Sequence, residues 1–509
     1  ILRKGLADPL ALLAGQPEVL TNCSPGKVRA ITYALVHGVL ADADWKRWAS
    51  LGSLVSLLAE ADPDTYLKII ESDLLRPETA NLKHLFGEVE GGIFGGFYHS
   101  GLLWSLEVLA WKPEYLSRVA LVLTDLAQFS LPENMGNNPL ASLRSIFLPW
   151  MPQTTASVDQ RKAAVRGVIQ ANAETGWKLL LSLLPESHST TSRTQRPQWR
   201  GWIPRDWRDG VTNGERWQQE QNYADFALEI ARKDPSKLQD LLGRIAHLPE
   251  ATFKALLAQL TDLAETDLPE SERLLLWQKL MKEATRHRRF AGAEWAMPAD
   301  VVAKVEQTAH ALEPKRPEIR HQSLFNSQSF DLYQSDDYEA DEKRIAEQRQ
   351  KAVGDVRAKV GLRGLVEFAQ AVAQPTDVGT ALGAVGDRES DSFLLPALLG
   401  NADSSIANLV SGYAWGRHHR KGTDWLAELP LKDWTPAQAG HFFSLLPFTR
   451  EVWKRAEELL GENANEYWKH LEGRPHGTPD QVLEAVGKLL QYDRGASALR
   501  TMQTLLYKI

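Results

Sequence analysis

Cysteine is almost absent from this sequence: Cys23 is the only one among 509 residues. A single thiol cannot form a disulfide within the chain, and such sparse usage is typical of proteins kept in a reducing cytoplasm. Long apolar runs are also absent, because no stretch approaches the roughly 20 apolar residues that a membrane span requires. The sequence therefore predicts a cytoplasmic protein with no membrane-spanning segment.

Motifs of the common catalytic centres are missing as well. The sequence contains no G-x-x-x-x-G-K-[ST] phosphate loop, no H-E-x-x-H zinc motif and no G-x-S-x-G nucleophile elbow, and one cysteine excludes C-x-x-C. The histidines are scattered apart from the pair His418-His419. We therefore expect no enzymatic activity, cofactor or metal site in this chain.

Alternating strand patterns are absent, whereas helical spacing recurs throughout. No run of six or more residues alternates cleanly between apolar and polar, so a sizeable sheet is not expected. Apolar residues instead follow the i, i+3, i+4, i+7 spacing of one helix face, as in 116–123, 223–230 and 482–489. Asp62-Pro63 and Asp234-Pro235 each place an N-cap aspartate before a proline at the first helical position.

These signals predict an all-α protein built as an irregular α-solenoid, a superhelical array similar to tetratricopeptide or HEAT repeats but without a fixed period. A chain of this length exceeds a single compact core. We place an N-terminal helical array at 1–184, an Arg/Trp-rich loop at 185–214, a middle array at 215–312, a linker at 313–335 and a C-terminal array at 336–509. The chain begins at Ile1 rather than at a methionine, and we expect it to be part of a longer protein.

One polar segment concentrates arginine and tryptophan within the predicted loop. Arginine binds carboxylates and phosphates through paired hydrogen bonds, tryptophan stacks on flat groups, and both are enriched in interface hot spots. Three interpretations stay open: a surface that binds a protein partner, a surface that binds nucleic acid, or a loop pinned to neighbouring helices by its tryptophans while its arginines pair with acids. The candidate binding residues are Arg193, Arg196, Trp199, Arg200, Trp202, Arg205, Trp207 and Arg208.

A second basic cluster is formed by Arg417, His418, His419 and Arg420 and precedes Gly422. Cations at a helix C-terminus complement the helix dipole, and glycine commonly follows the last helical residue. The cluster is therefore either a helix end or a contact for a phosphate or an acidic partner. Trp425, Trp434, Trp453 and Trp468 lie near expected helix ends, where large aromatics lock helix pairs in the core.

Several sequence segments resemble the long C-terminal helical sensor region of large bacterial antiphage defence proteins, such as the Avs-type STAND NTPases. The segments are residues 101–104, 111–116, 138–154, 196–202 and 446–453. The resemblance implies a helical-repeat surface that recognises a phage protein, with NTPase and effector domains upstream of this chain.

We therefore expect a protein-recognition region that binds a phage or partner protein, with oligomerisation possible through domains outside this chain. A scaffold or regulatory subunit of a larger complex is one alternative. A helical nucleic-acid-binding module is another, although a formal net charge of −7 restricts it to local basic patches.

Overall fold

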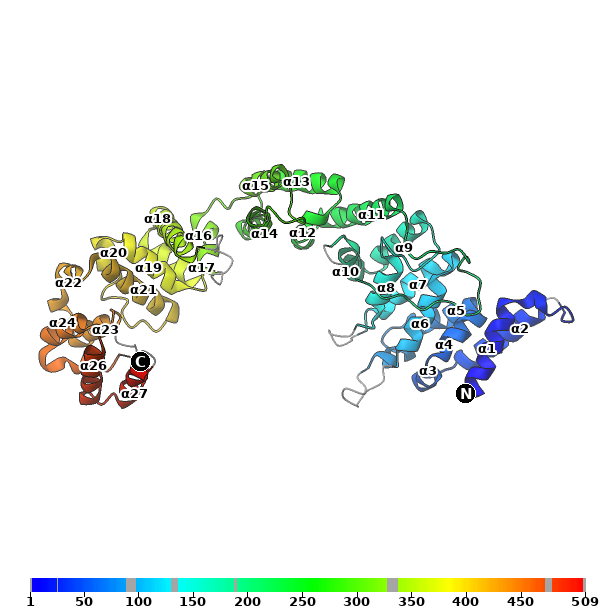
Figure 1. Ribbon diagram of the computed structural model, residues 1–509, viewed down its shortest axis with the longest axis horizontal. Helices are drawn as coiled ribbons and strands as arrows, with labels where there is room; N and C mark the ends of the chain where they lie inside the picture. Colours follow the sequence, from blue (N-terminus) through cyan, green and yellow to red (C-terminus); the bar gives the residue numbers. More distant parts are fainter. Residues whose placement is uncertain are drawn as a thin grey trace. The chain divides into compact units, whose positions relative to one another are not determined.

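The computed structural model describes residues 2–24, 26–87, 98–129, 136–186, 190–326, 337–471 and 478–506 (Figure 1). The all-α prediction is confirmed, because every regular element in these ranges is a helix. The chain divides into two compact units. Unit 1 comprises Ile1–Thr266 and Gly292–Thr308, and unit 2 comprises Asp267–Ala291 and Ala309–Ile509. These limits differ from the boundaries expected from the sequence, since unit 1 takes in the first array, the Arg/Trp loop and most of the middle array.

Unit 1 is a succession of helices in which each packs on its neighbours, α1 on α4, α4 on α6, α6 on α7, and α7 on α9. Its helices are α1 Leu2–Gly15, α2 Lys27–Leu40, α3 Trp45–Leu51, α4 Leu54–Ala61, α5 Pro63–Leu74, α6 Ser100–Ala110, α7 Pro113–Leu126, α8 Pro139–Phe147, α9 Val158–Ala171, α10 Ala173–Leu183, α11 Asn213–Ala231, α12 Pro235–Leu242 and α13 Glu250–Ala264. Helix α15, Ala299–Ala311, crosses the boundary between the units.

Unit 2 contains the remaining helices. They are α14 Glu270–Arg289, α16 Pro317–Arg320, α17 Ser323–Asn326, α18 Tyr338–Gln370, α19 Pro375–Val385, α20 Arg388–Leu394, α21 Ser404–Lys421, α22 Asp424–Glu428, α23 Pro436–Ser444, α24 Arg450–Leu460, α25 Asn465–Trp468, α26 Pro479–Gln491 and α27 Gly495–Leu506. The expected linker at 313–335 thus holds α16 and α17, and its residues 327–335 lie outside the described ranges.

The local signals in the sequence place the helices correctly. Asp62 accepts a hydrogen bond from the backbone N–H of Thr65, and Asp234 accepts one from Ser236, so both aspartates cap helices that begin with proline. The stripe predicted over 116–123 is buried in α7, and the stripe over 482–489 is buried in α26. Helix starts and buried faces therefore follow from short-range patterns in the sequence.

The tryptophans expected in the core are there. Trp425, Trp453 and Trp468 are fully buried and Trp434 is nearly so, and all four belong to one apolar core of unit 2. Trp453 and Trp468 lie with ring centroids 6.2 Å apart, and Phe448 meets both at steep angles. Each large ring fills the space between short helices that could not bury much surface alone.

The tightest helix contact in unit 2 depends on glycines. A Cβ atom on Gly379 or Gly383 of α19 would collide with the backbone of α21, and one on Gly412 or Gly416 of α21 would collide with the backbone of α19. Because each helix presents two glycines four residues apart, the two backbones touch without intervening side chains. This spacing lets helices approach more closely than larger side chains would allow.

Candidate partner-binding surface

A segment without helix, residues 190–212, runs from the loop after α10 to the start of α11; we call it the strap. It contains all eight candidate residues of the Arg/Trp segment. Hydrogen bonds tie it to α4 and α6, which lie far earlier in the sequence. The structure thus places these eight residues on one segment, which follows a defined path along helices of unit 1.

The strap backbone is held first by the carboxylate of Glu60 at the end of α4, which is 1% exposed. Its oxygens accept three consecutive backbone N–H groups, from Gln198 at 3.0 Å, Trp199 at 2.7 Å and Arg200 at 3.2 Å. The Arg200 guanidinium donates to the carbonyls of Glu60 and Ala61. Burial raises the pKa of Glu60, and the three N–H donors oppose part of that rise.

A second buried carboxylate holds the strap on α6. Glu107 accepts the backbone N–H of Gln195 at 3.0 Å and the hydroxyl of Ser142 at 2.7 Å, and burial raises the pKa of Glu107. The indole N–H of Trp111 donates to the carbonyl of Gln195 at 2.9 Å, so both backbone polar groups of that residue are satisfied. Buried charges of this kind are costly unless they are paired or hydrogen-bonded, as these are.

The three strap tryptophans are half-buried and each lies against unit 1. Trp199 packs on the apolar cluster formed by α1 and α4, and its indole N–H donates to Asp8 at 3.4 Å. The ring of Trp202 lies 6.0 Å from that of Tyr115, and the ring of Trp207 meets Trp111 edge-on at 5.9 Å. These contacts agree with the pinning interpretation for the tryptophans.

The arginines differ from one another in what they contact. Arg193 pairs with Asp209 at 2.8 Å, and Arg196 pairs with the same carboxylate while lying over the Trp111 ring. Arg205 and Arg208 are exposed and form no ion pair with any residue that the structure describes. Arg193 is also well exposed, at 68% of its side chain. The strap therefore separates residues that hold it in place from arginines that face solvent.

The other candidate cluster lies in unit 2, at the end of α21. Arg417 is 2% exposed, donates two hydrogen bonds to Asp391 at 3.0 and 2.7 Å, and donates a third to the carbonyl of Gly386. Asp391 also accepts from the Tyr413 hydroxyl and the Trp425 indole. The prediction that Arg417 contacts a partner does not fit this burial, because its guanidinium already forms a buried ion pair with Asp391.

The rest of this cluster lies nearer the surface. His418 is half-buried, and burial lowers its pKa. His419 stacks on the exposed ring of Trp415 with a centroid distance of 5.1 Å, and Arg420 is exposed. Helix α21 ends at Gly422 with a positive φ of 65°, and its N–H bonds to the carbonyl of His418, as the capping interpretation expects.

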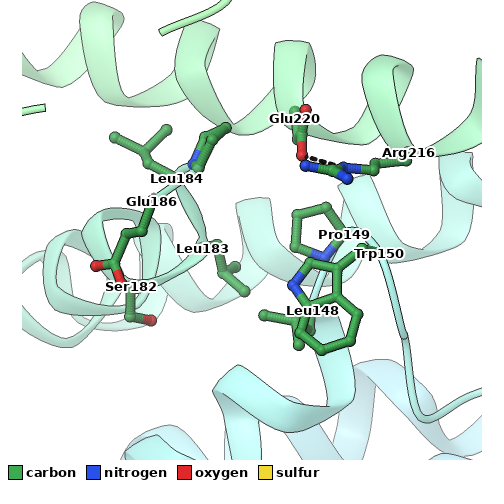
Figure 2. Close-up of a pocket in the computed structure, with 10 residues that line it drawn as sticks. Leu148, Pro149, Trp150, Ser182, Leu183, Leu184, Glu186, Arg216 and Glu220 are labelled. Carbon is green, nitrogen blue, oxygen red and sulfur yellow. Dashed lines mark hydrogen bonds and ion pairs between the residues drawn. The ribbon is translucent and has the colours of Figure 1, made fainter. Parts of the chain in front are cut away.

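A small cavity lies beside the C-terminal end of the strap, where Gly210 approaches the backbone of Trp150. Figure 2 shows the residues that line this cavity. Its volume is about 40 Å³, and a Cβ on Gly210 of the strap would sit 3.5 Å from the carbonyl oxygen of Trp150 in its wall. Arg216 and Glu220 of α11 form an ion pair at 2.7 Å on one side of it. The lining residues are Leu148, Pro149, Trp150, Ser182, Leu183, Leu184, Pro185, Glu186, Arg216 and Glu220. Pockets for cofactors commonly measure about 300–1,000 Å³, so this cavity suits a side chain rather than a cofactor.

Sequence reasoning missed the acids that organise both clusters. Glu60 and Glu107 lie among mainly apolar buried residues of α4 and α6, and that placement was the available signal for them. Asp391 lies beside the buried Ser390 in the mostly polar helix α20, which offered no such signal. A carboxylate on a buried face requires partners, but nothing local says that the partners lie 88 or 138 residues away along the chain.

Within the residues described, no group of three or more histidine, cysteine, aspartate or glutamate side chains is arranged to hold a metal ion. No described helix is long and apolar enough to cross a membrane. Compared with known protein families and with curated protein sequences, the chain has no match in either.

Proposed function

We propose that this chain is a protein-recognition region and that the strap is its contact surface. The observation that carries the proposal is that the strap is held through its backbone while several of its arginine side chains are exposed. The buried carboxylates of Glu60 and Glu107 accept hydrogen bonds from its backbone, while Arg193, Arg205 and Arg208 face solvent. A surface whose backbone is already ordered loses less entropy on binding, so more of the contact energy appears as affinity.

The biological setting that we propose is bacterial antiphage defence, with a phage protein as the partner. That setting rests on the resemblance of residues 101–104, 111–116, 138–154, 196–202 and 446–453 to the helical sensor regions of such proteins. The segment 196–202 contains strap residues 198–200, whose backbone N–H groups donate to Glu60, so the resemblance covers the part of the strap that lies between the exposed Arg193 and Arg205. A scaffold subunit would use the same surface for a permanent partner.

The direct test measures binding of individually purified phage proteins to the purified chain. We expect at least one of them to bind with a Kd of about 1 μM or tighter, which corresponds to about 8 kcal/mol of binding free energy. The double variant Arg205→Ala/Arg208→Ala should weaken that binding at least about tenfold without lowering the melting temperature, since both side chains are exposed.

Arg232→Ala is the matched control, because Arg232 is an exposed arginine of the same unit outside the strap. It should leave affinity and stability unchanged. Binding that persists unaltered in the double variant would assign recognition to another surface. A partner that is a constant host subunit, with no phage protein bound, would favour the scaffold alternative.

A further inference from the structure

The strap carries a strong local excess of positive charge. Five arginines and two aspartates lie between residues 190 and 212, in a chain whose formal net charge is −7. Asp209 is shared by Arg193 and Arg196, and Arg200 is bonded to backbone carbonyls of α4. Arg205 and Arg208 form no ion pair among the described residues, and with the exposed Asp206 between them they leave a net positive charge with which a ligand of opposite sign can pair.

The rings of Trp202 and Trp207 already contact neighbouring side chains, which leaves less of their faces for nucleic-acid bases. The guanidinium of Arg200 lies over the Trp202 ring at 5.8 Å, and Tyr115 packs against the same ring. Trp207 is engaged edge-on by Trp111. Proteins that bind single strands place bases on exposed aromatic faces. Paired hydrogen bonds from arginine to carboxylate need no such face, and they are the other main use of exposed arginine.

The cavity beside the strap adds a second recognition element, with a lining that is partly apolar and partly polar. Leucine, proline and tryptophan side chains form most of its lining, and the charged groups at its rim are already paired, Arg216 with Glu220 and Glu186 with Arg244. Gly210 adjoins its wall, and Arg208 is two residues earlier, so its Cα lies within roughly 7 Å of that of Gly210. A chain laid along the strap would therefore meet the arginines and the cavity in succession.

The geometry points to an acidic, extended segment of a partner protein as the ligand of this surface. Its carboxylates would pair with Arg205 and Arg208, and a small aliphatic side chain would enter the cavity between Leu148, Leu183 and Trp150. This inference rests on the proposed function and names the chemistry of the partner: alternating acidic and small apolar residues, with the charge complementary to the strap.

The test uses three fluorescein-labelled peptides of equal length, alternating Glu with Val, Gln with Val, or Glu with Gly, and an oligothymidylate of similar length. We expect the Glu/Val peptide to bind the full chain, and the Gln/Val and Glu/Gly peptides to bind at least about tenfold more weakly. Arg205→Ala/Arg208→Ala should weaken the Glu/Val peptide at least about tenfold, whereas Arg232→Ala should not. Arg205→Lys/Arg208→Lys should retain only part of the affinity, since lysine keeps the charge without the paired donors.

Equal binding of the Glu/Val and Gln/Val peptides would overturn the acidic assignment, and equal binding of Glu/Val and Glu/Gly would overturn the role of the cavity. Tighter binding of the oligothymidylate, weakening steeply between about 50 and 200 mM salt, would assign the strap to nucleic acid. If no peptide binds but a phage protein does, this inference fails while the proposed function stands. If neither binds, both fail.

Discussion

Removing the carboxylate of Glu60 should release the middle of the strap. Glu60 is buried and accepts three backbone N–H groups at 2.7–3.2 Å. A hydrogen bond to a charged group contributes about 1.5–3 kcal/mol, and a buried donor left without a partner costs about 1–3 kcal/mol. Gln198 is exposed and its neighbours are half-exposed, so water can replace part of the loss. We therefore expect Glu60→Ala to lower the unfolding free energy of unit 1 by about 2–4 kcal/mol.

Amide hydrogen exchange measures the loss of protection at the strap residues themselves. A chain with two compact units need not unfold in one step, so a single global midpoint would blur the result. The amides of residues 198–200 should exchange at least about tenfold faster in Glu60→Ala, which corresponds to about 1.4 kcal/mol of lost local protection. Glu60→Gln keeps one acceptor oxygen and should fall between the wild type and Glu60→Ala.

Glu78→Ala provides the control, because Glu78 is an exposed glutamate of the same unit. Its unfolding free energy should stay within about 0.5 kcal/mol of the wild type, as for most surface substitutions. The reasoning is refuted if Glu60→Ala matches Glu78→Ala in stability and leaves exchange at residues 198–200 unchanged. In that case the strap would be held by its tryptophans alone.

Three further predictions concern packing, charge and pH. Gly412→Ala should destabilise unit 2 by about 2 kcal/mol or more, because the added Cβ would collide with the α19 backbone. Gly354 is a helical glycine with open space around it, so Gly354→Ala should stabilise unit 2 by about 0.5–1 kcal/mol. Thermal unfolding of both variants tests this pair of predictions. Asp391→Ala should lower the unfolding free energy by about 3–5 kcal/mol, because it leaves the buried guanidinium of Arg417 without its charged partner. Adding Arg417→Met should recover much of this loss, and a denaturant titration of the single and double variants measures both effects. Because burial raises the folded pKa of Glu60 above its usual value of about 4.5, the folded state takes up the proton before the unfolded state as pH falls. The unfolding free energy of the wild type relative to Glu60→Gln should therefore rise as pH falls from neutrality towards that usual value; a constant difference would contradict the buried carboxylate.

The sequence predicts what is local in this fold. Asp62 and Asp234 mark helix starts because an N-cap aspartate before proline satisfies orphan N–H groups within one turn. Trp453 and Trp468 lie in the core as expected, because burying rings of that size removes a large apolar area from water. Such inferences succeed because the cause and the effect lie within a few residues of each other.

The candidate surface depends on contacts that no local pattern specifies. Glu60 meets the strap across 138–140 residues of sequence, and Arg417 meets Asp391 across 26. The run 417–420 looks like a basic patch in the sequence because four similar residues are adjacent, yet Arg417 points into the core and His419, two residues later, is exposed. Helix periodicity separates neighbours by about 100° around the axis, so adjacent charges on a helix rarely share an environment.

The strap is held through its backbone while Arg205 and Arg208 are exposed, and under the proposed function this separation has a consequence for how the surface can change. Substitutions at Arg205 or Arg208 alter the exposed charge without touching the bonds to Glu60 and Glu107, because those bonds run to the strap backbone rather than to its side chains. The partner-facing chemistry can therefore vary while the path of the strap stays fixed. A recognition surface that must follow a changing partner benefits from this arrangement, since most side-chain changes would cost affinity or specificity without costing the fold.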